Sequence, residues 1–233
     1  MSEIFKEIYR KSIEDPENFW RKAADDIFWF KKPSKILNKS NPPFYKWFED
    51  GVTNTCYNAL DIHIDNGQGK RTALIYDSPI TGNKSKLTYE QLRSKVSKFA
   101  GALANQGVGK GDRVIIYMPM IPEAVIAMLA CGRIGAIHSV VFGGFASNEL
   151  ASRIDDSKAK ILVTASCGFE PGRTVEYKPL VDEAVKLADH KISKMILFQR
   201  KDHEVKLNAP AEISWDEALA DSKDCLLYTS DAA

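Results

Sequence analysis

Short apolar segments alternate with amphipathic segments through the second half of the chain, and this order constrains the fold more than any other feature. The apolar segments have the length and composition of strands, and apolar residues recur at helical spacing between them. Strands that alternate with helices pair in parallel through right-handed crossovers, and near-continuous apolarity predicts burial on both faces. We therefore expect an α/β fold with a doubly wound, mainly parallel sheet. The expected strands span residues 113–118, 137–142, 160–165 and 194–199, and the expected helices span 122–135, 147–157 and 175–189.

The first part of the chain predicts helices and short strands ahead of this sheet. Asp15 followed by Pro16 is typical of a helix start, and apolar residues continue at close to helical spacing to residue 30. Thr88 and Gln91 fit a capping box for a helix that stops at Gly107. We expect strands at residues 71–77 and 86–89, a helical and irregular N-terminal region over residues 1–65, and a partial α/β domain over residues 66–224.

The charge balance and the cysteine spacing exclude several classes of protein. Lys and Arg number 32 against 31 Asp and Glu, which argues against a nucleic-acid or anionic membrane partner. Charged residues and prolines interrupt the apolar tract 113–145, so no stretch is long enough to span a bilayer, and the N-terminus lacks the core of a secretory signal. The four cysteines show no metal-site spacing, which favours reduced, mostly buried thiols in a cytoplasmic protein: Cys56, Cys131, Cys167 and Cys225.

Ligands of doubly wound sheets bind beyond the carboxyl ends of the strands. Gly143 and Gly144 lie where a predicted strand meets a helix, with Ser147 as a plausible N-cap. Glycine permits close approach to a ligand, although a tight turn is the simpler interpretation. The glycines of "GVGKGDR" (residues 107–113) follow a helix and precede a strand, which is the reverse of a dinucleotide-binding motif, so we interpret them as a turn.

The loop "TASCGFEPGRTVEYKP" carries the most informative side chains. Arg173 lies between a predicted strand and a predicted helix, with Lys178 nearby, and could bind a phosphate together with amides at the helix start. A solvated surface arginine is the alternative. Cys167 has no local histidine or aspartate to activate it as a nucleophile, and His138 at the start of an apolar strand is interpreted as a packed, hydrogen-bonded residue.

Several long blocks together resemble the short-chain acyl-CoA synthetases of the AMP-forming, adenylate-forming superfamily. They include "SNPPFYKWFEDGVTNTCYNALD", "KGDRVIIYMPMIPEAVIAMLACGRIGAIHSVVFGGFASNELASRIDD" and "ASCGFEPGR…YKPLVDEA". The resemblance covers about residues 8–220. Within the family, the block "ASCGFEPGRTVEYKPL" is more similar to propionate–CoA ligases than to acetate–CoA ligases, which usually carry "ADEG" and a second arginine in this loop.

The resemblance implies both a coenzyme A site and a two-step reaction. Glu170, Pro171, Gly172 and Arg173 fall on the family's coenzyme A-binding loop, where Arg173 would meet the 3′-phosphate and Glu170 would weaken that grip. Gly143 and Gly144 resemble positions that line the same cleft. A short-chain carboxylate, propionate or acetate, would attack ATP to give acyl-AMP, and coenzyme A would then displace AMP. The resemblance places the catalytic residues and the ATP and Mg²⁺ sites C-terminal to this chain.

The last nine residues, "CLLYTSDAA" (225–233), imitate the start of the family's phosphate loop and then depart from it. Asp231 stands where that loop requires a glycine, and its charge would repel phosphates. The string TGT CTC TTA TAC ACA TCT GAC GCT GCC, which resembles a transposon-end sequencing adaptor, translates to the same nine residues. We expect residues 225–233 to be translated adaptor and the chain to be an N-terminal fragment without ligase activity.

Two alternative functions remain open from the sequence. One is a non-catalytic α/β module that binds coenzyme A or a nucleotide. The other is an interaction domain that uses the aromatic segment 41–57, for which the sequence offers no chemical signature.

Overall fold

The structure, a computed structural model, describes residues 2–231 apart from 202, 221 and 226–229. Most of the expected adaptor segment therefore lies outside the described residues. The chain forms two compact units, residues 1–54 with 229–233 and residues 55–228. The predicted domain boundary at residue 65 stays a prediction.

The first unit contains two helices and short antiparallel strand pairs. Pro16 opens α2 and the Asp15 carboxylate accepts a hydrogen bond from the Asn18 amide at 3.4 Å, which confirms the predicted helix start. The helix ends at Ala24, earlier than expected, and the Ala24 carbonyl accepts from the Trp29 indole at 2.8 Å and from the Ile27 amide at 3.3 Å. The elements are α1 (Glu3–Glu14), α2 (Pro16–Ala24), β1 (Leu37–Asn38) paired with β2 (Lys46–Trp47), and β3 (Val52–Thr53) paired with β13 (Ser230–Asp231).

The second unit is built on a five-stranded parallel sheet with the order β12–β11–β8–β6–β7. Every neighbouring pair is parallel, which confirms the predicted fold class. Four of the strands match the apolar segments expected from the sequence, whereas β12 adds an edge strand that was not predicted. The strands are β6 (Arg113–Met118), β7 (Ile137–Phe142), β8 (Ile161–Ala165), β11 (Lys194–Phe198) and β12 (Glu212–Ser214).

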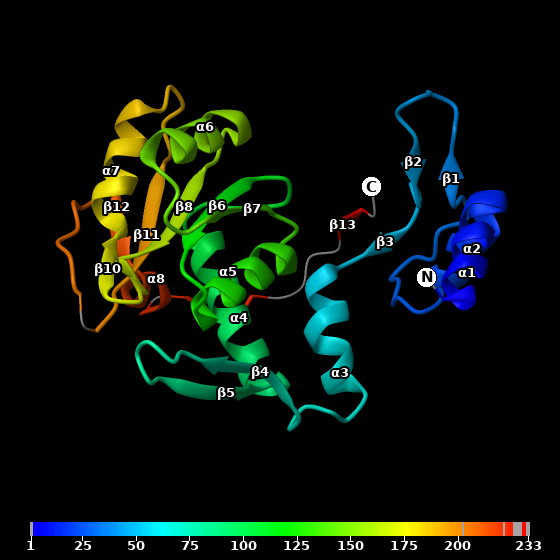
Figure 1. Ribbon diagram of the computed structural model, residues 1–233, viewed down its shortest axis with the longest axis horizontal. Helices are drawn as coiled ribbons and strands as arrows, with labels where there is room; N and C mark the ends of the chain where they lie inside the picture. The colour runs from blue at the N-terminus through cyan, green and yellow to red at the C-terminus, as the bar shows by residue number, and fades with distance from the viewer. Residues whose placement is uncertain (1, 202, 221, 226–229, 232–233) are drawn as a thin grey trace. The chain divides into compact units, whose positions relative to one another are not determined.

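Helices cover both faces of the sheet, as double winding requires (Figure 1). The strand β6 alternates between the two layers: Ile116 packs in the core with Phe99 and Trp215, while Ile115 packs with Leu150 and Val181 on the opposite face. The first layer contains α4 (Tyr89–Asn105), α5 (Pro122–Arg133) and α8 (Trp215–Ala220), and the second contains α6 (Ser147–Ser157) and α7 (Tyr177–Leu187).

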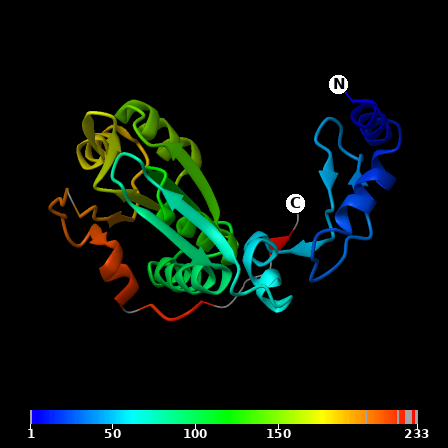
Figure 2. The same ribbon diagram turned by 60° about the horizontal axis from the view of Figure 1, so that its bottom comes forward.

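The helix α4 begins and ends where the sequence predicts. The Thr88 hydroxyl accepts from the Gln91 amide at 3.2 Å and the Gln91 side chain accepts from the Thr88 amide at 2.9 Å, completing the capping box. Gly107, just past the helix end, adopts the left-handed conformation with a φ of +81°. A two-stranded hairpin lies against α4 in both views (Figures 1 and 2). The preceding elements are η1 (Tyr57–Asp61), α3 (Ile62–Asp65) and the hairpin strands β4 (Thr72–Asp77) and β5 (Lys84–Thr88).

A buried ion pair joins α5 to the chain that precedes the hairpin. Arg133 Nη1 lies 2.9 Å from Asp61 Oδ2, and both side chains are only 8% exposed. The same guanidinium donates through Nε to the Cys225 carbonyl at 3.0 Å, and Ser97 donates to that carbonyl at 3.1 Å. The contact uses only backbone atoms of Cys225, so it leaves the origin of residue 225 untested.

The edge strand β7 departs from the expectation of burial on both faces. Ile137, Val140 and Phe142 are 55%, 53% and 70% exposed. His138 is also exposed, so its interpretation as a packed residue is wrong. The apolar segment has the composition of a buried strand, but β7 has a neighbour on one side only.

We expect Asp61→Ala to lower the free energy of unfolding by about 3–5 kcal/mol, because it leaves the Arg133 guanidinium buried without its counter-charge. Urea denaturation followed by circular dichroism measures the change. The control is Glu183→Ala, which removes an exposed partner of Lys186 and should cost less than about 1 kcal/mol. Equal effects of the two substitutions would contradict a structural role for the buried pair.

Candidate functional site

The strand order reverses between β6 and β8, and this reversal marks the edge where a ligand is expected. The chain leaves β6 toward β7 on one side, then returns past β6 to place β8 on the other side. Loops that leave the carboxyl ends of two such strands diverge and open a crevice. The segments at this edge are Pro119–Ile121 after β6, the glycine loop Gly143–Ala146 after β7, and residues from Ser166 onward after β8.

A β-hairpin follows β8, where a plain strand-to-helix loop was expected. Strand β9 (Cys167–Glu170) pairs antiparallel with β10 (Arg173–Glu176), and Pro171 and Gly172 form the turn between them. Gly172 has a φ of +77°, and Pro followed by a glycine with positive φ is typical of a type II turn. The dipeptide Pro-Gly between alternating apolar residues was the sequence signal for this hairpin.

The turn brings Glu170 and Arg173 together as an exposed ion pair. Arg173 donates to the same Glu170 carboxylate oxygen through Nη2 at 2.6 Å and through Nε at 2.7 Å. The Arg173 side chain is 70% exposed and the Glu170 side chain 44% exposed. An exposed pair of this kind is worth about 0–1 kcal/mol, so an incoming anion can displace the carboxylate at low cost. The guanidinium therefore fits a phosphate, in competition with Glu170.

The surroundings of Arg173 differ from those expected from the sequence. Lys178 was predicted nearby, but it is buried in α7, where its ammonium lies 2.5 Å from Asp182 and 3.0 Å from Glu212. It joins α7 to β12 and offers no exposed charge to a ligand. Arg173 lies in β10, ahead of the helix that begins at Tyr177, and joint binding of a phosphate by Arg173 and amides at the helix start stays a prediction.

A different cation supports the hairpin. The Arg200 guanidinium lies 4.8 Å from the centre of the Phe169 ring in β9. The Arg200 amide donates to the Ser166 hydroxyl at 2.9 Å. Because Arg200 follows β11, these contacts tie the hairpin to the neighbouring strand end, and spacing in the sequence carried no signal for them.

Two buried tyrosines hold the glycine loop against the hairpin. The Tyr117 hydroxyl donates to the Phe145 carbonyl at 2.8 Å and accepts from the Gly144 amide at 3.2 Å. The Tyr177 ring lies 5.0 Å from the Tyr117 ring and packs so closely on Gly143 that a Cβ there would collide with its hydroxyl. Burial raises the pKa of Tyr177 to about 12, so the phenol is neutral at physiological pH. The close approach of Tyr177 gives Gly143 a packing role.

Of the remaining residues that the sequence singled out, the structure contradicts the interpretation of one and agrees with that of the others. Ser147 is the first residue of α6 rather than its cap; Ala146 occupies the cap position without a side-chain hydrogen bond. Cys167 is fully buried, in agreement with its rejection as a nucleophile. The thiols of Cys56 and Cys131 are free and buried, and burial raises their pKa to about 11 and about 12. "GVGKGDR" forms the turn before β6, at the opposite edge of the sheet from the hairpin.

The carboxyl edge also has a hollow of about 690 Å³ beside the ends of β6 and β11. Its walls come from three places: the hairpin β4–β5, the start of α5 and the segment after β11. The charged residues that line it are Lys84, Glu123, Arg200 and Lys201. Cations outnumber the carboxylate there, which favours anionic ligands at this edge.

Two kinds of feature are absent from the described part of the chain. None of its helices has both the length and the apolar character needed to cross a membrane. No cluster of three or more His, Cys, Asp or Glu side chains within it could hold a metal ion.

We expect Tyr117→Phe to lower the free energy of unfolding by about 1–3 kcal/mol, because the Phe145 carbonyl and the Gly144 amide each lose their partner. Tyr177→Phe is the matched control. Its hydroxyl has no hydrogen-bond partner among the residues the structure describes, so its removal should change stability by less than about 0.5 kcal/mol. Chemical denaturation of both variants measures the difference, and a Tyr177→Phe loss as large as that of Tyr117→Phe would contradict this assignment.

Comparison with known proteins identifies the family. A sequence model of the AMP-binding enzyme family matches residues 63–230, and one described as the acetyl-coenzyme A synthetase N-terminus matches residues 5–59. The chain is 51% identical over 230 residues to acyl-CoA synthetase short-chain family member 3, mitochondrial, from Rattus norvegicus, covering 97% of this chain and 34% of that protein. It is 45% identical to acetyl-coenzyme A synthetase from Streptomyces coelicolor over 93% of this chain and 33% of that protein.

A solved structure shares the fold. Acetoacetyl-CoA synthetase from Streptomyces lividans superposes with a TM-score of 0.81 at 22% identity, covering 95% of this chain and 34% of that one. The chain thus spans about a third of the length of the relatives that it matches. The family matches and the shared fold confirm the resemblance seen in the sequence, and the chain belongs to the AMP-binding enzyme family, among relatives that are short-chain acyl-CoA and acetyl-CoA synthetases.

Proposed function

We propose that the chain is the N-terminal part of an acid–CoA ligase that activates a short-chain carboxylate with ATP and transfers the acyl group to coenzyme A. The family match over residues 63–230 is the observation that carries this proposal. The carboxylate oxygen attacks the α-phosphorus of ATP and expels pyrophosphate. The coenzyme A sulfur then attacks the acyl carbon, and AMP leaves with the electrons of the broken mixed anhydride bond.

In this proposal the hairpin turn supplies a contact to coenzyme A. Glu170, Pro171, Gly172 and Arg173 form an exposed turn at the ligand edge of the sheet, and the guanidinium of Arg173 already binds a carboxylate there. The 3′-phosphate of coenzyme A would replace that carboxylate, because the phosphate carries more negative charge and more acceptor oxygens. Gly143 and Gly144 would lie along the same ligand, on the loop that Tyr117 holds.

Propionate is our proposed acid, with acetate as the second candidate. The support is the segment from Ser166 to Arg173, which is more similar to propionate–CoA ligases. The ATP and Mg²⁺ contacts are assigned to residues outside this chain. A cytoplasmic location stays a prediction from the free thiols, since the relative from Rattus norvegicus is described as mitochondrial.

We expect Arg173→Ala to raise the Kd of the chain for coenzyme A about tenfold and to leave the Kd for 3′-dephospho-coenzyme A unchanged. Glu170→Gln should have the opposite effect, because it removes the competing carboxylate. Isothermal titration calorimetry measures both. In a full-length relative with the same Glu-Pro-Gly-Arg turn, the alanine substitution should weaken coenzyme A binding more than ATP binding. Equal losses for the two ligands would reject the assigned role.

We also expect purified residues 1–224 to form no acyl-CoA from propionate, ATP, Mg²⁺ and coenzyme A, because the proposal assigns the ATP contacts to residues outside the chain. Thioester formation is followed by its ultraviolet absorbance, with a full-length relative as the positive control. Steady turnover by residues 1–224 would overturn this part of the proposal.

A further inference from the structure

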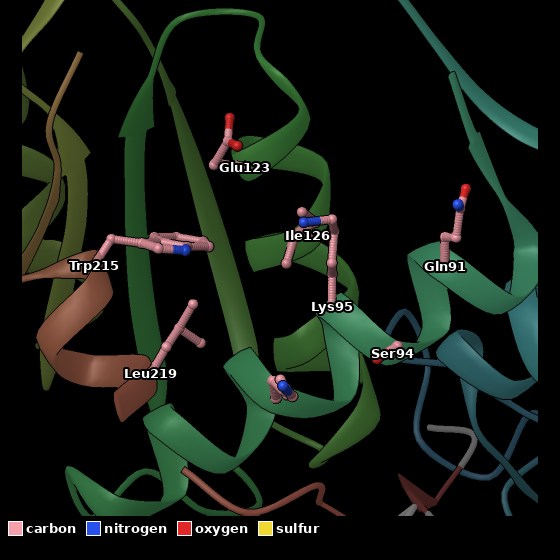
Figure 3. Close-up of a pocket in the computed structure, with 8 residues that line it drawn as sticks. Gln91, Ser94, Lys95, Glu123, Ile126, Trp215 and Leu219 are labelled. Carbon is pink, nitrogen blue, oxygen red and sulfur yellow. The ribbon is translucent and has the colours of Figure 1, made fainter. Parts of the chain in front are cut away.

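A second hollow lies on the face of the sheet that α4, α5 and α8 cover, and no residue of the hairpin turn lines it. It has a volume of about 440 Å³ and lies among α4, α5 and α8. That volume is within the range of small-molecule sites in proteins. Figure 3 shows side chains from all three helices around it. The residues that line it are Gln91, Ser94, Lys95, Lys98, Glu123, Ile126, Trp215 and Leu219.

The floor of the hollow is apolar and rigid. Trp215 stacks on Phe99 with ring centres 3.7 Å apart and makes a T-shaped contact with Phe198 with ring centres 5.9 Å apart. Ile126 and Leu219 complete the apolar lining. In Figure 3 the Trp215 indole extends from α8 toward α5, with Leu219 beside it. Such a floor suits the apolar body of a small ligand.

The rim of the hollow carries two lysines, Lys95 and Lys98. Lys95 and Lys98 are exposed on α4, three positions apart, and so lie on the same side of the helix. Within the described ranges, neither ammonium has a carboxylate at ion-pair distance. Figure 3 shows the Lys95 side chain directed toward Ile126, on the α5 side of the hollow.

One carboxyl group faces these cations. Glu123 lies at the start of α5, and burial raises the pKa of its carboxyl while the fields of Lys95 and Arg200 act against that rise. Even when it is ionised, this single carboxylate offsets only one of the two ammonium charges. The remaining positive charge attracts an anion, and a phosphate dianion matches two ammonium groups better than a single carboxylate does.

From this geometry we infer that the hollow among α4, α5 and α8 binds a phosphate monoester with an apolar body, the phosphate lying between Lys95 and Lys98 and the body against Trp215 and Ile126. The site is separate from the proposed coenzyme A turn, because no residue of that turn lines it. The inference about this hollow does not depend on whether Arg173 binds coenzyme A.

The test uses phenyl phosphate as the probe and the whole chain as the protein. Phenyl phosphate should bind at least about tenfold more tightly than inorganic phosphate, because only the ester can use the apolar floor. It should also bind more tightly than benzoate, which carries one charge. Binding should shift the indole N–H signal of Trp215 in a ¹⁵N–¹H spectrum, assigned through Trp215→Phe. Saturating coenzyme A should leave this affinity unchanged.

Substitutions that remove a positive or a negative charge from the hollow distinguish binding in the hollow from non-specific attraction of the anion to the protein. Lys95→Gln should weaken phenyl phosphate binding about three- to tenfold, and Glu123→Gln should strengthen it. Arg93→Gln is the matched control, since it removes one charge from the same helix outside the hollow. The inference is overturned if phenyl phosphate binds no better than inorganic phosphate, if Arg93→Gln weakens binding as much as Lys95→Gln, or if coenzyme A competes.

Discussion

The parallel pairing of β6 with β7 on one side and β8 on the other is the constraint on which the second unit depends. It buries the backbone of β6 and β8 at the centre of the sheet, so their polar groups are satisfied only by neighbouring strands. It also sends the chain in opposite directions from adjacent strand ends. The glycine loop and the hairpin therefore emerge at the same edge, although residues 147–166 separate them in the chain.

Side-chain contacts then turn this edge into a defined surface. Tyr117, on β6, reaches the backbone of the glycine loop, and Tyr177, on α7, fills the space that Gly143 leaves open. Arg200 contacts the hairpin strand β9 through the Phe169 ring. At the turn itself, the exposed Glu170–Arg173 ion pair adds to the antiparallel pairing of β9 with β10. Rigid support below an easily exchanged ion pair is a suitable arrangement for binding an anionic ligand.

The two hollows differ in what their charges can do. At the strand ends, Arg200 and Lys201 line the hollow, and Arg200 also contacts Phe169 in the hairpin. Among α4, α5 and α8, the two lysines stand over an aromatic floor. Glu123 lines both hollows, and in each of them the cations outnumber this one carboxylate.

The sequence by itself determined the helices and strands that depend on interactions between residues close together in the chain. Period and apolarity located β6, β7, β8, β11 and the helices between them, and the capping box placed the start of α4 at Thr88. The family resemblance identified the Glu170–Arg173 segment. Only the tertiary structure decided the environment of these residues: it exposed β7 at an edge, buried Lys178 against Glu212 and paired Arg173 with Glu170. The edge position of β7 and the burial of Lys178 depend on neighbours distant in the chain, and the Glu170–Arg173 pair depends on the hairpin turn between the two residues, so local spacing alone does not encode them.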